Sequence, residues 1–345
     1  MTAIGKLLVV GPSWVGDMVM AQSLYRLLKA REPARAIDVL APAWSLPLLE
    51  RMPEVARGIE LPLGHGELGI GARRRLGRSL SGQYARAIVL PRSFKSALVP
   101  WFAGIARRTG FRGEWRYGII NDIRPFDPRR LDQTVRRFIA LGVEPGEDVL
   151  PEPPQPRLRV DRDAQGAVVA RLGLDLTKPV AALMPGAEYG PAKQWPPKYF
   201  ASLAGRLAAS GANVWILGSG KEAPLGREIA RAANAAGVVS LAGETALVEA
   251  VDLLALADVA VSNDSGLMHI AAAVGTHTVA IYGSSTPDFT PPLTANATVH
   301  YRRLSCSPCF ERECPLKHLD CLIGIGVDEV HASVERKLAT RAQRP

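Results

Sequence analysis

A short polar run at 263–266 (Asn-Asp-Ser-Gly) is where the residue types of this 345-residue chain point most directly to chemistry. It separates an apolar run at 259–261 from an Ala-rich apolar segment at 267–274, which predicts a loop between a buried strand and a helix. Gly275 ends that helix, and 278–282 predicts the next strand. Such a loop lies at the carboxyl edge of a parallel sheet, where the first N–H groups of a helix bind phosphate.

A plainer interpretation of the same run is an ordinary helix cap. Asn263, Asp264 and Ser265 are all residue types that favour the N-cap position, and Gly266 adds only backbone freedom. The run by itself therefore leaves two alternatives open, a phosphate-binding loop or a capped helix.

A second glycine loop stands near the start of the chain, after an apolar run at 6–10. Gly11 and Gly16 have the G-x4-G spacing of a P-loop, but Asp17 and Met18 follow where a P-loop needs Lys and Ser or Thr. A carboxylate there would repel a cradled phosphate, so we reject ATP hydrolysis through this loop. G-x-G-x-x-G does not follow this first apolar run, which argues against a dinucleotide enzyme. Asp17 is then either a helix-start residue stabilised by the helix dipole or a functional carboxylate.

Polar or glycine-rich loops recur after the predicted strands of the second half, at 185–196, 218–222 and 243–245. In a parallel sheet they all lie at the same edge as 263–266. Glu222 is a plausible partner for a ribose hydroxyl pair, since a carboxylate accepts two hydrogen bonds, although a solvated helix-start Glu is the alternative. This repetition favours a nucleotide site over a simple cap.

The elements that must position these loops alternate as strand and helix, which indicates an α/β fold with parallel sheets. The proline-rich stretch 145–156 predicts a linker. We expect a first domain at 1–150, a linker at 151–160 and a second domain at 161–345. Further strands are predicted at 36–40, 55–61, 87–90, 179–184, 213–217 and 238–241, and helices at 18–30, 43–50 and 199–209.

Charge is distributed unevenly along the chain. Residues 1–150 hold 23 Lys and Arg against 14 Asp and Glu, whereas the remaining residues hold 19 of each, so the net charge of +9 belongs to the first half. Such asymmetry indicates an anionic partner, either nucleic acid or a lipid or glycolipid surface; an Arg-rich surface without a partner is the alternative. No nucleic-acid-binding module is recognisable.

Four cysteines lie close together, at Cys306, Cys309, Cys314 and Cys321, with His318 among them. No signal peptide or long apolar segment is evident, so we expect a cytoplasmic protein, in which disulfides are rare. The spacing C-x2-C-x4-C-x6-C lacks the paired knuckles of common zinc modules. A zinc site and a loop with reduced thiols both remain open, and we expect no catalytic metal.

Three segments, GPSWVGDMVMAQSLY, LGSGKE and SNDSGLMHIAAAVGTHTVAIYG, together with AKQWP, resemble the ADP-heptose:lipopolysaccharide heptosyltransferases, most closely heptosyltransferase II. The resemblance covers nearly the whole chain. It implies the GT-B fold, in which two Rossmann-like domains face each other across a cleft, with the acceptor in the N-terminal domain and the donor in the C-terminal one. It also implies inverting transfer of L-glycero-D-manno-heptose from ADP-heptose to the inner core of lipopolysaccharide, with no metal or other cofactor.

The resemblance assigns roles to individual residues. Asp17 matches the catalytic carboxylate, which we expect to be the general base, and Lys193 matches a lysine that contacts donor phosphate and heptose. His269 falls in an apolar helix, where a structural histidine is the alternative to a ligand contact. The expected donor-binding residues are Ala187, Glu188, Glu222, Thr245, Asp264, Ser265, Gly266, Leu267 and His269. The expected acceptor-binding residues are Ser13, Trp14, Arg92, Lys95, Arg112 and Arg116.

The expected partners are ADP-heptose and a phosphorylated acceptor containing Kdo and lipid A. We expect the protein at the inner face of the cytoplasmic membrane, without nucleic acid. Transfer to Kdo2-lipid A, as in heptosyltransferase I, stays open beside transfer of the second heptose to heptosyl-Kdo2-lipid A. A non-catalytic nucleotide-sugar-binding protein is the alternative from another class, although such a protein would have no need of Asp17.

Overall fold

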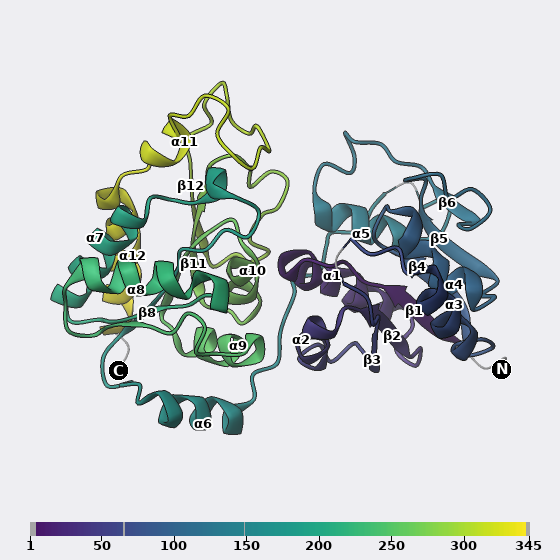
Figure 1. Cartoon of the computed structure of the whole chain (residues 1–345), viewed down its shortest axis with the longest axis horizontal. Helices are drawn as coiled ribbons and strands as arrows, with labels where there is room; N and C mark the ends of the chain where they lie inside the picture. The colour runs from purple at the N-terminus through teal and green to yellow at the C-terminus, as the bar shows by residue number, and fades with distance from the viewer. Residues whose placement is uncertain (1–4, 65, 148, 343–345) are drawn as a thin grey trace. The chain divides into compact units, whose positions relative to one another are not determined.

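The computed structural model describes residues 5–64, 66–147 and 149–342. The chain divides into two compact units, Met1–Pro156 and Arg157–Pro345, and each is described by itself (Figure 1). Among the described residues, no helix combines the length and the apolar character needed to span a bilayer.

The first unit is built on a sheet of six parallel strands in the order β3-β2-β1-β4-β5-β6. Its central strands are mostly buried, because helices cover both faces of such a sheet. The strands are β1 (Lys6–Val10), β2 (Ile37–Ala41), β3 (Arg57–Glu60), β4 (Tyr84–Val89), β5 (Arg107–Phe111) and β6 (Asp122–Arg124). The helices are α1 (Val15–Arg31), α2 (Leu46–Glu50), α3 (Ile70–Ser79), α4 (Leu98–Phe102) and α5 (Thr134–Gly142); α1 packs against α5, and α3 packs against α4 (Figure 1).

The second unit repeats this plan, with the order β12-β11-β10-β7-β8-β9 and all pairs parallel. Its strands are β7 (Val180–Met184), β8 (Asn213–Ile216), β9 (Val238–Ser240), β10 (Val259–Asn263), β11 (His277–Tyr282) and β12 (Ala297–Tyr301). Its helices are α6 (Arg162–Leu172), α7 (Pro197–Ala209), α8 (Ala223–Ala233), α9 (Leu247–Leu256), α10 (Gly266–Ala273), α11 (Asp320–Ile323) and α12 (Val327–Ala342).

Both sheets have the strand order of a Rossmann-like fold, which confirms the predicted α/β class of GT-B type. In each unit the first strand lies beside the fourth, and the strand order reverses between them. That reversal falls between β1 and β4 in the first unit and between β7 and β10 in the second. Ligands of open α/β sheets bind at the carboxyl ends of strands at this point, so these two places define where to look for sites.

Three strands were not predicted from the sequence, and each lacks a plain apolar run. β5 begins with Arg107 and Arg108, β6 has only three residues, and β12 lies at the edge of its sheet. Edge and short strands depend on the neighbour with which they pair, so local composition indicates them poorly.

Candidate functional site

Asn263 fastens the two central strands of the second unit together at their carboxyl ends. It is the last residue of β10 and is fully buried. Its Nδ2 donates to Pro185 O at 2.8 Å and to Gly186 O at 3.2 Å, in the loop that follows β7. Its Oδ1 accepts from the backbone N–H of Trp195 at 2.9 Å. The side-chain amide of Asn263 therefore uses both its donor and its acceptor groups to hold the segment after β7 against the end of β10.

Lys193 and Asp264 form an ion pair at this edge. The Nζ of Lys193 lies 2.5 Å from Oδ2 of Asp264, and the side chains are only 17% and 5% exposed. Thr290 Oγ1 lies 3.3 and 3.4 Å from the two carboxylate oxygens, and the ammonium lies 5.1 Å from the centre of the Tyr189 ring. The pair joins a loop after β7 to the loop after β10, which puts a cation at the start of α10.

The start of α10 is not capped by the side chain of its N-cap residue. Ser265 is extended there, with φ −141° and ψ 169°, and makes no cap hydrogen bond; its Oγ lies 3.0 Å from Ser262 Oγ instead. Asp264 is paired with Lys193, and Asn263 bonds to other loops. Ser265 therefore occupies the N-cap position, but no side chain of 263–266 caps the helix by a hydrogen bond. Gly266 begins the helix and Leu267, half-buried, follows it.

His269 lies in α10 with 4% of its surface exposed. Burial lowers its pKa to about 4, and the nearby carboxylate of Asp264, which favours the charged ring, only partly opposes this effect. The cation of Lys193 lowers the pKa further. The ring is therefore neutral at neutral pH, so His269 contributes an imidazole and not a cation to this edge.

Glu222 lies directly over Gly186. A Cβ built on Gly186 would stand 1.5 Å from Glu222 Oε1, so only glycine leaves room for this carboxylate. Its other oxygen, Oε2, accepts from the backbone N–H of Ser219 at 2.6 Å and from its hydroxyl at 2.9 Å. The carboxylate is thus fixed between the ends of β7 and β8 and is only partly exposed.

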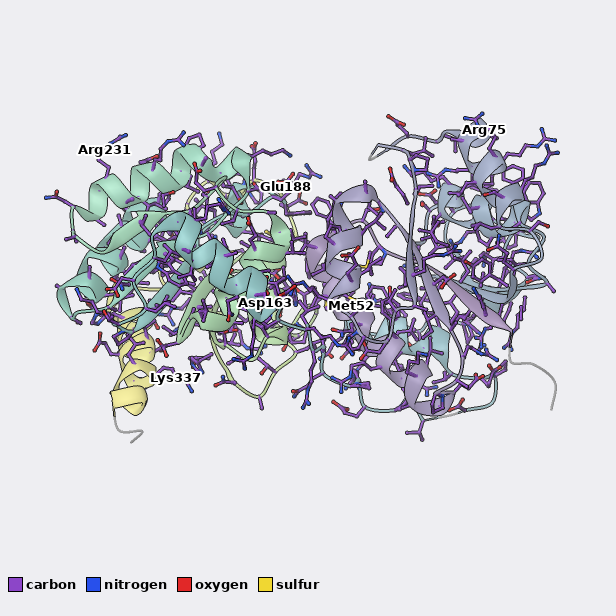
Figure 2. All side chains as sticks on the ribbon, turned by 90° about the horizontal axis from the view of Figure 1, so that it is seen from below. Met52, Arg75, Asp163, Glu188, Arg231 and Lys337 are labelled. Atoms are coloured by element: carbon purple, nitrogen blue, oxygen red, sulfur yellow. The ribbon has the colours of Figure 1, made fainter. Side chains whose placement is uncertain are left out.

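The remaining predicted donor residues occupy the same set of loops. Ala187 is half-buried beside Gly186, and Thr245 is half-buried in the loop that connects β9 to α9. Glu188 is exposed (Figure 2). It pairs with Lys221, whose Nζ lies 2.9 Å from its Oε1. Both side chains of that pair are more than half exposed, so it contributes little to stability.

In the first unit, the Asp17 loop lies at the switch point between β1 and β4. Leu90 donates its backbone N–H to Val10 O at 3.1 Å, which brings the two strand ends together. Gly11 allows α1 to return closely, since a Cβ there would stand 2.9 Å from the side chain of Met18. Trp14 is the N-cap residue and is 42% exposed, Ser13 is exposed, and Asp17 is half-buried in the first turn.

Arg116 differs from the other predicted acceptor residues because its guanidinium is buried, with 1% of the residue exposed. It donates to Pro91 O at 2.8 Å and to Phe111 O at 2.6 Å, which ties the loop after β4 to the end of β5. Burial lowers its pKa to about 10, so it stays charged at neutral pH. Arg116 thus positions these loops, and its buried guanidinium does not support the expected direct contact with an anionic acceptor.

Arg92, Lys95 and Arg112 remain accessible on the loops that Arg116 ties together. Arg92 and Arg112 are exposed and Lys95 is half-buried. The guanidinium of Arg92 lies 4.5 Å from the centre of the Phe126 ring, and that of Arg112 lies 5.2 Å from the Tyr117 ring. Cations held on aromatic rings at the carboxyl edge suit an anionic, sugar-bearing ligand.

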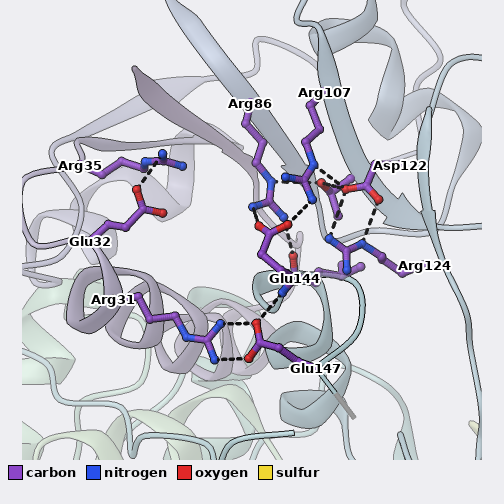
Figure 3. Close-up of polar contacts among 11 residues, drawn as sticks. Arg31, Glu32, Arg35, Arg86, Arg107, Asp122, Arg124, Glu144 and Glu147 are labelled. Atoms are coloured by element: carbon purple, nitrogen blue, oxygen red, sulfur yellow. Dashed lines mark hydrogen bonds and ion pairs between the residues drawn. The ribbon is translucent and has the colours of Figure 1, made fainter. Parts of the chain in front are cut away.

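Other arginines of the first unit serve its own structure. Arg86 and Arg107 bind Glu144 at 2.8 and 2.5 Å, and Arg107 and Arg124 bind Asp122 at 2.9 and 3.0 Å (Figure 3). Arg86 and Arg107 stand near the amino ends of β4 and β5, opposite the carboxyl edge. Several arginines of the first half therefore form ion pairs within the unit, and their positive charge is partly neutralised there.

The chain matches the model of glycosyltransferase family 9 (heptosyltransferase) over residues 73–320. The chain belongs to this family. The lipopolysaccharide heptosyltransferase 2 of Escherichia coli K12 is 52% identical over 303 residues, which cover 85% of this chain and 87% of that protein. The lipooligosaccharide heptosyltransferase 2 of Haemophilus influenzae is 46% identical over 306 residues, covering 85% and 88%.

Among solved structures, the ADP-heptose lipopolysaccharide heptosyltransferase II of Escherichia coli has a TM-score of 0.86 and 44% identity to this chain. It covers 98% of this chain, and the match covers 99% of that protein. These similarities confirm the family and the glycosyltransferase class expected from the sequence. The individual site residues stay predictions.

Two residues that contact the Lys193–Asp264 pair were missed in the sequence. Thr290 lies in the loop after β11 and contacts Asp264, and Tyr189 lies under the ammonium of Lys193. The polar stretch that starts at Gly283, directly after β11, was the available signal for the first. Tyr189 lies four residues before Lys193 within a loop, where no helical or strand period relates the two positions.

Proposed function

We propose that this glycosyltransferase moves L-glycero-D-manno-heptose from ADP-heptose to the inner core of lipopolysaccharide, as the second heptose on heptosyl-Kdo2-lipid A. The names of its relatives support this choice, because those 52% and 46% identical are heptosyltransferases 2. The Escherichia coli structure with TM-score 0.86 names ADP-heptose as its donor.

The single observation that carries the donor assignment is the Lys193–Asp264 pair at the start of α10. ADP leaves with added negative charge, which an ammonium and the N–H groups of a helix start can stabilise. We assign the diphosphate to this place and the ribose to Glu222, which lies at the neighbouring strand ends over Gly186. His269, Thr245, Ala187, Glu188, Ser265, Gly266 and Leu267 complete the proposed donor site.

We assign the acceptor to the first unit. Its anionic sugars would bind Arg92, Lys95 and Arg112, near Ser13 and Trp14, while Arg116 holds the loops in place. Asp17 would take the proton from the attacking hydroxyl. One displacement at the anomeric carbon inverts its configuration, so the hydroxyl oxygen forms the new bond as the bond to ADP breaks. ADP carries away the electron pair of the broken bond.

The test is a transfer assay with ADP-heptose and two acceptors, Kdo2-lipid A with and without the first heptose. We expect transfer to the heptosylated acceptor alone. Transfer to bare Kdo2-lipid A would identify the type I reaction. ADP-heptose binding without transfer to either acceptor would identify a binding protein, and the proposal would be wrong in both cases.

We also propose that the first unit works at the anionic inner face of the cytoplasmic membrane. Trp115 is 88% exposed beside the cations of the carboxyl edge, and an exposed Trp suits a lipid interface. Co-sedimentation with phosphatidylglycerol vesicles should exceed that with phosphatidylcholine vesicles and should fall with added salt. Equal sedimentation with both vesicles would contradict this location.

A further inference from the structure

The four cysteines line one small cavity in the second unit. None of them belongs to the proposed donor site. Cys306, Cys309 and Cys314 lie in the segment between β12 and α11 and are half-buried, whereas Cys321 in α11 is 7% exposed. The cavity has a volume of about 20 Å³, and Ala192 and Ser284 also line it. That volume is room for a single water or a single ion.

Polar groups of the surrounding backbone converge on this cavity. The backbone N–H groups of Leu316, Lys317, His318 and Leu319 point at the Cys314 sulfur. Lys317 and Leu319 have left-handed φ angles of 58° and 57°, which wrap the chain around that sulfur. N–H groups directed at one sulfur favour its thiolate, which is the form that binds metals.

The other side of the cavity is lined by Cys321, which is buried with 7% exposed. Ser284, with 1% exposed, also has an Oγ without a hydrogen-bond partner among the described residues. Thiols that converge at one point repel one another as thiolates, so a cation is the natural partner for the cluster.

We propose that Cys306, Cys309, Cys314 and Cys321 are the four ligands of a structural thiolate site for a soft divalent cation of the Zn²⁺ class. Four thiolates suit tetrahedral Zn²⁺ or Fe²⁺, and no open position is left for chemistry. His318 is not assigned as a ligand, because its Nδ1 accepts the backbone N–H of Asp320 at 2.9 Å. The cysteine side chains have to turn about their Cα–Cβ bonds to bind, since no three ligand-type side chains of the described residues stand in metal-binding geometry.

The cation would fix the segment that supports the Lys193 loop. Ala192, which lines the cavity, donates its N–H to Arg312 O at 3.0 Å, and Tyr189 donates its hydroxyl to Phe310 O at 2.5 Å. Gly190 approaches Arg312 so closely that a Cβ would stand 2.4 Å from its carbonyl oxygen. The cysteine segment is thereby attached to the residues that directly precede Lys193, so the metal site has a positioning role in the proposed donor site. This second step rests on the proposed function, whereas metal binding does not.

The first experiment uses the full chain, purified without a metal-affinity resin or a chelator. Elemental analysis should find one equivalent of zinc or iron per chain, and its identity distinguishes the two cations. The four thiols should react slowly with a disulfide reagent, react quickly after chelation, and regain protection on addition of Zn²⁺. Substoichiometric metal, together with thiols that react at once and ignore added Zn²⁺, would overturn the metal site.

The second experiment compares Cys309→Ser with His318→Asn. The Ser variant should lose the metal and bind ADP about tenfold more weakly, as expected when a charged contact is displaced. The Asn variant should keep both, because its side-chain oxygen can still accept the Asp320 N–H. Metal loss with unchanged ADP affinity would overturn the positioning role. If Cys309→Ser fails to fold, chelated wild-type protein provides the same comparison. If untreated wild-type protein does not bind ADP, that result counts against the proposed donor site and not against the metal site.

Discussion

Gly186 is the position where one added methyl group tests the donor site most directly. In Gly186→Ala, the new Cβ would overlap Glu222 Oε1, which is the end of a flexible side chain and can move. We expect the carboxylate to leave its place, so that ADP binds about tenfold more weakly while stability changes by only about 1 kcal/mol. Isothermal titration with ADP and urea unfolding measure the two effects.

The matched control for this substitution is Gly166→Ala in α6. A Cβ at Gly166 meets nothing within 4 Å, and helix interiors favour Ala over Gly by about 0.5–1 kcal/mol. This variant should be slightly more stable and bind ADP normally. Unchanged ADP affinity in Gly186→Ala would remove Glu222 from the proposed ribose site.

Asp17 tests the proposed chemistry at the same scale. Asp17→Asn keeps the size of the side chain and the turn between Gly11 and Gly16, so the variant should fold and bind ADP-heptose normally. Its kcat should fall by about 10²–10⁴-fold, the usual contribution of a general base. Steady-state rates with the heptosylated acceptor test this role. Near-normal turnover in the variant would mean that Asp17 is a structural residue of α1 and not the general base.

At the scale of an element, α10 carries a pH-dependent contribution to stability through His269. The folded-state pKa of about 4 lies below the unfolded value, so the unfolded chain takes up the proton first as pH falls. This contribution is therefore complete above about pH 6.5 and is lost as pH falls toward 4, by on the order of 3 kcal/mol. His269→Gln should weaken this acid destabilisation in urea unfolding curves measured over that range. Parallel curves for the two proteins would show that the imidazole does not titrate as its burial predicts.

The loops after β4 and β5 form the element that we expect to bind the acceptor. The charge reversals Arg92→Glu and Arg112→Glu should each raise the acceptor KM about tenfold or more, because a charged hydrogen bond becomes a repulsion. Affinity for ADP should not change. Arg75→Glu on α3 is the matched control, since Arg75 is exposed on that helix (Figure 2). Equal losses in the control would indicate a nonspecific charge effect.

At the scale of the whole molecule, each unit has its own complete sheet, buried core and switch point. All the proposed donor residues belong to Arg157–Pro345. We therefore expect this unit, expressed alone, to fold cooperatively and to bind ADP with affinity similar to that of the full chain. The isolated Met1–Pro156 unit is the control and should not bind ADP. A folded second unit without ADP binding would mean that the donor site needs residues from the first.

The sequence by itself determined what depends on neighbours along the chain. Apolar runs such as 6–10 and 259–261 predicted strands because a buried parallel strand is apolar on both faces, and the glycine loops marked where these strands end. The α/β class, the position of 263–266 at a strand end and that of Asp17 at a helix start followed from that pattern. Recognition of the family also rested on contiguous motifs.

Only the tertiary structure decided which distant side chains meet. Lys193 and Asp264 are 71 positions apart, and no local period relates them. Arg116 has the composition of a surface arginine, yet loops that come together only in the folded sheet surround it with carbonyl oxygens. The cysteine spacing left a zinc site and a plain loop open, and only the fold placed all four cysteines around one cavity beside Ala192. Contacts of this kind depend on strand order and loop packing, which are set by the whole chain and not by any short stretch of it.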